Sequence, residues 1–394
     1  MKFNYFFILI IVFLNLSCKS TKKEHISNID GTIMNDSIYF VDLDVEEEKN
    51  PILFSTIFNK VETIILETRN DALITQLFEL QAFDDYIFIL NQQNPRNFMI
   101  FDRTGKFIRK IGGIGQGPGE YVRVYDFTID PDNKVIFLNC DLVINKYKID
   151  GTFLGAIQTG GHSTQIQFCN GKLYLDGLGG YLIRELDPET GKQTFQYLDV
   201  KQYNKGYMEP LFKFGGGPFK YRSNESPKFV HTFMDTIMAI QPYGIIPFLA
   251  ITSNNLTTNA DIADTKELIQ NERIESIRNK NKIFCINLYF ETKNHIGFSY
   301  IYGKNLIYIL YDRQNKSYKK GKFRNDLVFD GKRQMQNIKY SDANGVYESF
   351  HEGFTLDYIY GQIQNGGLSL NLDKRDEIMK LPEDTNPVIF YYSY

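Results

Sequence analysis

Tryptophan is absent from the sequence, and histidine and cysteine are scarce: five His and four Cys occur in 394 residues. Proteins that bind glycans commonly stack sugar rings on aromatic side chains. Without Trp, that platform would have to come from the 26 Tyr. The composition therefore weighs against a dedicated glycan binder without excluding one.

The sequence also lacks local metal-binding patterns. No His-x-His or His-x-x-x-His pair occurs among the five histidines, which are His25, His162, His231, His295 and His351. Such spacing is what places two ligands on one face of an element. The pairs Asp42-x-Asp44 and Asp130-x-Asp132 lack the rest of a calcium loop. We predict no metal and no cofactor, although a fold can gather single residues from distant segments.

Signatures of catalysis are missing as well. No Gly-x-Ser-x-Gly motif is present, and the linear sequence nominates no catalytic residues. The paired carboxylates of a glycosidase come from distant strands, so a hydrolase or lyase stays open. Charge gives no further lead, because 44 Lys and Arg nearly balance 47 Asp and Glu. Binding to nucleic acid depends on clustered Lys and Arg, and we expect none here.

The N-terminus holds a short apolar run. Lys2 precedes the run Phe6–Leu14, and Asn15-Leu16-Ser17-Cys18 follows it. A basic start, an apolar core and a small residue indicate a secretory signal, and the run is short for a membrane span. Cys18 directly after Ser17 resembles the lipobox of bacterial lipoproteins, although Asn15 stands where Leu is usual. The alternative is an ordinary signal peptide with an incidental Cys.

These features predict three parts of the chain. Residues 1–17 would be the lipoprotein signal peptide, and residues 18–37 the lipidated Cys18 with a polar tether. Residues 38–394 would form the folded body. With Cys18 lipidated, the odd number of remaining cysteines excludes a complete disulfide framework. We interpret the other three cysteines as buried free thiols, because Cys140, Cys169 and Cys285 lie in apolar segments that are predicted to be strands.

A repeat of four short apolar runs divides the folded body. The first copy spans Ile74–Ile111, with Asp, Asn and Gly residues between its runs, and copies follow at Arg123–Ile157 and Gln165–Leu198. Their turn glycines Gly105, Gly151 and Gly191 stand 46 and 40 residues apart. Four strands in each period of 40–50 residues indicate propeller blades.

Weaker copies continue to the C-terminus. Units around 210–251 and 283–323 precede a sixth unit, which has strand candidates at Tyr347–Phe350, Phe354–Tyr360 and Val388–Ser393. The early strand Val61–Glu67 has no blade of its own, so we place it in the last blade, where it closes the ring. Helical insertions are predicted at Asp264–Lys280 and Asp373–Leu381. The fold class is an all-β, six-bladed propeller of four-stranded antiparallel blades.

The stretches Leu66–Asn91 and Phe101–Asp130, the segment Gly115–Tyr121, Met234–Ile240 and the terminal Asn386–Tyr392 carry a family likeness. The chain resembles the six-bladed β-propeller lipoproteins of Bacteroidota, which relate loosely to NHL-repeat propellers. The resemblance covers Val61–Tyr394. It implies the propeller fold and a place in the cell envelope, and it implies no activity.

The glycine cluster between the first two blades is the candidate binding loop. Gly113 and Gly115 are followed by Pro118 where a dinucleotide motif needs Gly, and no helix is predicted to follow. A connector shaped by glycines and a fixed Pro is the structural alternative. If the loop binds a ligand or partner, the residues concerned are Gly115, Gln116, Gly117, Gly119, Glu120, Tyr121 and Arg123. A second glycine run, Gly215–Pro218, indicates a bulged inner strand or a loop of the fourth blade.

Together these observations favour an envelope lipoprotein of the outer membrane, on its periplasmic or its surface face. Its propeller would bind a protein partner or a nutrient-type ligand, without catalysis. The membrane itself is a partner through the N-terminal lipid. One alternative is a hydrolase or lyase acting on a glycan or peptide at the propeller axis. Another is a structural subunit of an envelope assembly.

Overall fold

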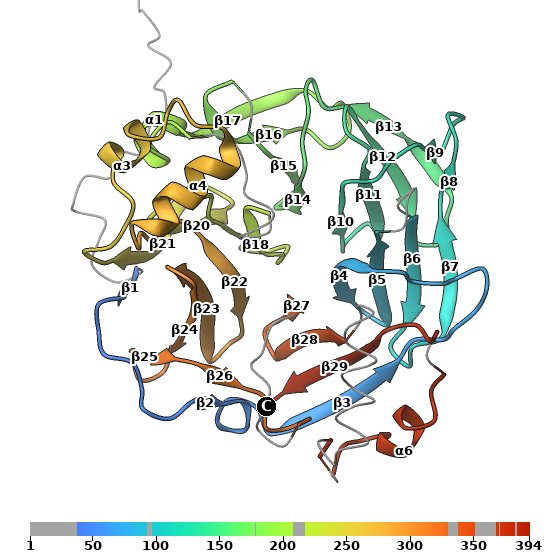
Figure 1. The fold of residues 1–394 in the computed structure, drawn as a ribbon. Coiled ribbons are helices and arrows are strands. Elements are labelled where there is room, and N and C mark those ends of the chain that lie inside the picture. The colour runs from blue at the N-terminus through green and yellow to red at the C-terminus, as the bar shows by residue number, and fades with distance from the viewer. Residues whose placement is uncertain are drawn as a thin grey trace, which may run out of the picture. The chain divides into compact units, whose positions relative to one another are not determined.

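Six antiparallel sheets radiate around a common axis, so that the chain forms a six-bladed β-propeller, as the sequence predicts (Figure 1). The computed structural model describes residues 38–92, 97–177, 179–207, 217–329, 338–350, 368–369, 371–382 and 384–394. These residues belong to one unit, Ile38–Tyr394. Cys18 and the strand candidate Phe354–Tyr360 lie outside the described residues.

Blades 1 to 3 are regular four-stranded meanders. Their strands follow the predicted copies closely, because each apolar run is bounded by Asp, Asn or Gly residues that turn the chain. Blade 1 has β4 (Leu77–Phe83), β5 (Tyr86–Asn91), β6 (Asn97–Asp102) and β7 (Phe107–Ile111). Blade 2 has β10 (Asp126–Asp130), β11 (Val135–Asn139), β12 (Val143–Lys148) and β13 (Phe153–Gln158). Blade 3 has β14 (Ile166–Cys169), β15 (Lys172–Asp176), β16 (Tyr181–Leu186) and β17 (Gln193–Asp199).

Blades 4 to 6 depart further from the repeat. Blade 4 has β18 (Phe219–Tyr221), β19 (Lys228–Phe229), β20 (Thr236–Gln241) and β21 (Gly244–Thr252). Blade 5 has β22 (Ile286–Glu291), β23 (His295–Tyr302), β24 (Asn305–Asp312) and β25 (Ser317–Gly321). Blade 6 has β27 (Ile338–Ser341), β28 (Gly345–Phe350), β29 (Val388–Ser393) and β3 (Lys60–Ile65).

The ring closes in blade 6, where β3 is the outermost strand. It pairs antiparallel with β29 from Val388↔Ile65 to Ser393↔Lys60. The predicted closure by the early strand is therefore confirmed. Asn386 reinforces the junction: its Nδ2 donates to the carbonyl of Glu67 at 2.7 Å, and its Oδ1 accepts from the amide of Ile74 at 2.8 Å. Closure pairs the strand edges that an open sheet would expose.

Two small sheets and an extra strand lie outside the regular blades. β1 (Tyr39–Asp42) pairs parallel with β21 and adds a fifth strand to blade 4, which the repeat pattern does not predict. β2 (Ile52–Leu53) precedes the 3-10 turn η1 (Phe54–Thr56) and pairs with β26 (Phe323–Arg324). β8 (Gly113–Ile114) pairs with β9 (Glu120–Tyr121) within the glycine-rich connection.

The helices differ from the prediction in their boundaries. The expected helix at Asp264–Lys280 is instead α3 (Asn259–Ala263), a turn, and α4 (Gln270–Asn279). α3 begins earlier because Thr258 and Asp261 form a reciprocal capping box. Ile274 and Ile277 are buried in the core, whereas Ile269 is 67% exposed. The two other short helices are α1 (Val200–Tyr203) and α6 (Arg375–Ile378), the latter within the predicted Asp373–Leu381. Across the described segments, no helix has the length and apolar character to cross a membrane.

Aromatic side chains fill the spaces between blades. Phe98 of blade 1 packs edge-on against Phe127 of blade 2, with ring centroids 4.6 Å apart. Phe137 of blade 2 stacks on Phe168 of blade 3 at 5.5 Å. Each buried ring removes about 150–250 Å² from water, so these contacts hold neighbouring blades together. The abundance of Phe and Tyr in the sequence thus serves the core between blades.

Candidate functional site

The two faces of the ring carry different kinds of connection. Each meander has four strands, so the chain leaves a blade at the same end at which it entered. Links between blades, and links between second and third strands, therefore share one face, which we term the connection face. Links between first and second and between third and fourth strands share the other, which we term the turn face.

The turn face consists of tight turns fixed by their own aspartates. Asp102 Oδ1 accepts hydrogen bonds from the amides of Thr104 at 2.9 Å and Lys106 at 3.0 Å. Asp150, Asp187 and Asp312 accept equivalent bonds at the same point of blades 2, 3 and 5. These side chains satisfy turn amides and leave little freedom for other roles.

Long connections and exposed apolar side chains gather on the connection face instead. The link between blades 4 and 5 spans 253–285 and holds α3 and α4. Among the described residues, seven large apolar side chains at least 36% exposed lie in connection-face links: Leu73, Ile114, Val122, Leu142, Leu268, Ile269 and Met379. In turn-face links, the one large apolar side chain of this exposure among the described residues is Tyr243, which is 78% exposed. The others, Phe40, Leu154 and Phe195, lie on the outer strands β1, β13 and β17.

The glycine-rich loop folds back on itself within this face. Gly115 donates its amide to the carbonyl of Tyr121 at 3.1 Å, and Gly117 donates to Glu120 Oε2 at 2.8 Å. A Cβ on Gly119, where φ is +75°, would lie 3.0 Å from the Phe153 ring. Gln116 and Gly117 are exposed. The structure thus brings these residues into one loop between β7 and β10, away from the propeller axis (Figure 1).

Three of the side chains nominated for binding in this loop, Glu120, Tyr121 and Arg123, have internal partners. Tyr121 is buried, and its hydroxyl donates to the carbonyl of Ile111 at 3.1 Å. Burial raises the pKa of that phenol well above its usual range. Arg123 donates to the hydroxyl of Tyr125 at 3.0 Å and covers its ring. What this loop still presents to a partner are the exposed side chains, chiefly Ile114, Gln116 and Val122.

A second candidate region is the propeller axis, where polar side chains cap the edges of the inner strands. Asp126 accepts from the amide of Ile166 at 2.8 Å, and Thr128 accepts from the amide of Phe168 at 2.9 Å. Gln81, Gln165 and Ser341 cap the neighbouring blade in the same manner. An inner strand has no further strand to pair with, so each cap satisfies a buried backbone group. Much of the axial polarity is therefore structural.

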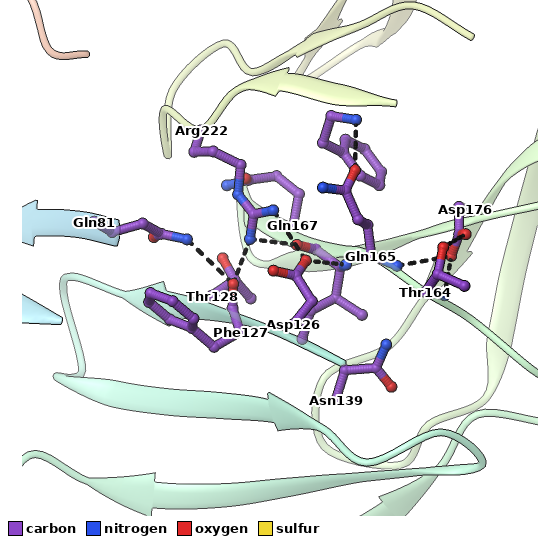
Figure 2. Close-up of polar contacts among 12 residues, drawn as sticks. Gln81, Asp126, Phe127, Thr128, Asn139, Thr164, Gln165, Gln167, Asp176 and Arg222 are labelled. Carbon is purple, nitrogen blue, oxygen red and sulfur yellow. Dashed lines mark hydrogen bonds and ion pairs between the residues drawn. The ribbon is translucent and has the colours of Figure 1, made fainter. Parts of the chain in front are cut away.

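One ion pair crosses this region. Arg222 Nη1 lies 2.9 Å from Asp126 Oδ2, and its Nη2 donates to the carbonyls of Phe127 and Ile166 (Figure 2). Burial disfavours the guanidinium charge, but Asp126 and Glu79 outweigh it and raise the pKa of Arg222. For Asp126, burial raises the pKa and the contact with Arg222 opposes the rise.

Glu79 on β4 completes the charged group at the axis. Burial raises the pKa of its carboxyl from 4.5 to about 7; Arg222 and Lys339 oppose the rise, and Asp126 adds to it. No hydrogen bond of its side chain is found within the described part of the chain. A carboxyl that titrates near neutral pH can exchange protons, which is the property a general acid or base needs.

Sequence reasoning missed this axial group. A signal was nevertheless present, since the inner strands of blades 2 and 3 alternate polar and apolar residues: Asp126, Thr128, Gln165 and Gln167. Strands buried on both faces rarely need such alternation unless one set of side chains reaches an axis or an edge. The partner Arg222 lies just beyond the short β18 and has no comparable signal.

Other candidate chemistry is limited in the part of the chain that the structure describes. There, no group of three or more His, Cys, Asp and Glu side chains is placed to hold a metal ion. Cys140, Cys169 and Cys285 form no disulfide with one another; Cys169 and Cys285 are buried, as interpreted from the sequence, whereas Cys140 is only half-buried. Burial raises the pKa of all three to about 12, which makes them poor nucleophiles.

Comparisons with known proteins agree with this architecture. A family model described as "Domain of unknown function (DUF4934)" matches residues 38–393, and the chain belongs to that family. The chain is similar to a crystal structure named as that of a "Putative exported protein" from Bacteroides fragilis, with 16% identity and a TM-score of 0.70. The match covers 90% of this chain and 99% of that chain, and it shows the shared propeller fold.

A second solved structure, a member of the DUF4221 family from Bacteroides vulgatus, has 13% identity and a TM-score of 0.47. Its match covers 86% of this chain and 97% of that chain. No curated protein matches the sequence.

Proposed function

We propose that this protein is an exported lipoprotein, anchored through Cys18, whose propeller binds an envelope partner with its connection face. The proposal rests chiefly on one observation, the concentration of exposed apolar side chains in the links of that face. Scattered exposed apolar residues are ordinary, but a bias toward the links of one face is typical of an interaction surface. The partner is an envelope protein or a nutrient complex held by one.

The N-terminal sequence supports the anchor. The pattern from Lys2 to Cys18 provides the signal, and residues 19–37 are polar enough to serve as a tether. The similar Bacteroides fragilis structure is named as an exported protein, which is in keeping with this location. Several acyl chains on one Cys would hold the protein on a membrane far more firmly than one chain can.

The anchor is tested by growth with an alkyne-bearing fatty acid, followed by detection of the label on the isolated protein. We expect labelling of the wild type and none of Cys18→Ser. The control variant Cys140→Ser keeps Cys18 and should label normally. Equal labelling of Cys18→Ser and wild type would overturn the lipoprotein assignment.

The surface is tested by single charge substitutions on the two faces. Ile269→Asp and Val122→Asp alter the connection face, and Tyr243→Asp alters an equally exposed position of the turn face. The full-length variants are isolated from envelope membranes, and the co-isolated protein is quantified against wild type. We expect the connection-face variants to lose partner and Tyr243→Asp to keep it. The reverse pattern would place the working surface on the turn face.

An enzyme acting at the axis is the second candidate, because Glu79 there titrates near neutral pH. It would be a hydrolase or lyase that uses this carboxyl as acid or base. Turnover of an envelope glycan or peptide by the wild type, abolished in Glu79→Gln and kept in Tyr243→Asp, would favour it.

A further inference from the structure

Two buried polar atoms at the axis have no partner within the described residues: Gln167 Oε1 and Arg222 Nε. Gln167 is 0% exposed and Arg222 is 5% exposed, so bulk water does not solvate them freely. The other polar atoms of these side chains bond to backbone carbonyls or to Asp126, but these two atoms have no such contact. A buried donor or acceptor left without a partner costs about 1–3 kcal/mol, so both positions call for an occupant.

The two side chains are neighbours. Gln167 Nε2 donates to the carbonyl of Phe168 at 2.7 Å and to that of Ser223, the residue after Arg222, at 3.3 Å. These bonds fix which way the amide points, since a reversed amide would set its oxygen against two carbonyls. Figure 2 shows the Gln167 amide beside the Arg222 guanidinium.

The chemistry of the two atoms selects the occupant. Arg222 Nε can only donate a hydrogen bond, and Gln167 Oε1 can only accept one. A carboxylate could accept from Arg222 but could not donate to Gln167, and an ammonium group could do only the converse. A hydroxyl group does both, as does water. Glu79, within electrostatic range of Arg222, offers a further acceptor on the same axis.

We propose that the axis is a binding site for a small polyhydroxylated ligand of the sugar class. One ligand hydroxyl accepts from Arg222 Nε and donates to Gln167 Oε1, and another donates to the Glu79 carboxylate. Recognition through hydrogen bonds of this kind does not need the stacking platform that the absence of Trp removes. The site is independent of the connection-face partner, and each can fail without the other.

Water and a ligand hydroxyl can form the same two hydrogen bonds, so crystallography is used to show which of them occupies the site. Crystals of the mature wild-type protein are soaked with glycerol as a hydroxyl probe and compared with untreated crystals. We expect a glycerol hydroxyl within hydrogen-bond distance of both Gln167 Oε1 and Arg222 Nε. A single water that glycerol does not displace, or a direct bond between the two side chains, would overturn the ligand site.

Calorimetric titration with D-glucose, D-galactose and D-mannose gives the second measurement. We expect binding of at least one sugar by wild type, weakened about tenfold or more in Gln167→Met, which corresponds to the loss of one good hydrogen bond. Gln81→Met is the matched control, because the Gln81 amide caps the carbonyl of Phe127 at 3.1 Å and has no place in the proposed contact. Equal affinity of wild type and Gln167→Met, or no binding of any of the three sugars, contradicts the proposal. The glycerol soak uses the wild type and so stands even if Gln167→Met fails to fold.

Discussion

Arg222 and Asp126 form a buried ion pair that joins blade 4 to blade 2 across the inner strand of blade 3. Their closest atoms are 2.9 Å apart, and their side chains are 3% and 2% exposed. The same guanidinium donates to backbone carbonyls of blades 2 and 3. One side chain thus fixes the relative positions of three blades at the centre of the ring.

Removing one member of this pair should destabilise the fold strongly. Arg222→Met leaves a buried carboxylate without its counter-charge and three acceptors without their donor. We expect a loss of roughly 3–5 kcal/mol in the free energy of unfolding, measured by urea denaturation. Arg69→Ala breaks an exposed pair with Asp71, whose side chains are 47% and 62% exposed, and should cost less than about 1 kcal/mol. Similar losses for the two variants would show that the axial pair does not hold the blades.

The titration of Glu79 should make stability fall as pH rises. Its folded-state pKa of about 7 lies above the ordinary value of 4.5, so between these values the folded state binds more protons than the unfolded state. The free energy of unfolding therefore decreases with increasing pH across this window, by an amount on the order of 1–3 kcal/mol.

Urea midpoints at pH 5, 6, 7 and 8 measure the effect of Glu79. Glu79→Gln should flatten this part of the pH dependence and should be relatively more stable than wild type at pH 8. Glu272→Gln changes an exposed glutamate of α4 and should leave the profile as it is. An unchanged profile in Glu79→Gln would mean that this carboxyl keeps an ordinary pKa.

The three turn glycines should differ in their tolerance of alanine. All have positive φ, of 93° at Gly105, 90° at Gly151 and 70° at Gly191. A Cβ at Gly105 would lie 2.1 Å from the carbonyl oxygen of Ile65, and one at Gly191 would lie 2.5 Å from that of Gln158. At Gly151 the nearest atom is 3.8 Å away.

Gly151→Ala should therefore cost only the backbone strain, about 1–2 kcal/mol. Gly105→Ala and Gly191→Ala should cost more, because the turn of one blade must move away from the outer strand of the blade before it. Melting temperatures of the three variants give the order directly. A larger loss in Gly151→Ala than in the other two would contradict this packing.

The cysteines of the folded body should be inert toward thiol reagents. Because burial raises the pKa of all three to about 12, the thiolate fraction at pH 8 is very small. In a Cys18→Ser background, we expect slow modification by a maleimide in buffer and modification of all three in denaturant. Rapid labelling of the native protein would reveal an accessible thiol, and Cys140, the least buried, would be the first to check.

The sequence predicts the architecture well because the propeller repeats its local chemistry. Aspartate turns, a glycine with positive φ and runs of alternating or apolar residues recur in blades 1 to 3, and each specifies its own hairpin. The last blade is predictable for a different reason: Val61–Glu67 is a strand without a partner, and ring closure is the arrangement that pairs it. Blade 4 is less predictable, since its inner strand β18 has three residues and its outer strand is supplemented by β1.

The axial group could not be predicted, because its members are distant in sequence and meet only through the ring. Asp126 and Arg222 are 96 residues apart. Their pairing depends on how many blades separate them and on the length of each connection. The predicted start at Asp264 differs from the observed start of α3 for a local reason, since Thr258-Asn-Ala-Asp261 forms a capping box further upstream.

The most direct test of the connection face is photo-cross-linking in intact cells. A photo-reactive amino acid replaces Ile269, Val122 or Tyr243 in the full-length chain, which compares two positions of the connection face with one of the turn face at similar exposure. We predict that Ile269 and Val122 cross-link to the same envelope protein and that Tyr243 does not. Cross-linking of that protein from Tyr243 alone, or from none of the three positions, would contradict the assignment of the connection face as the binding surface.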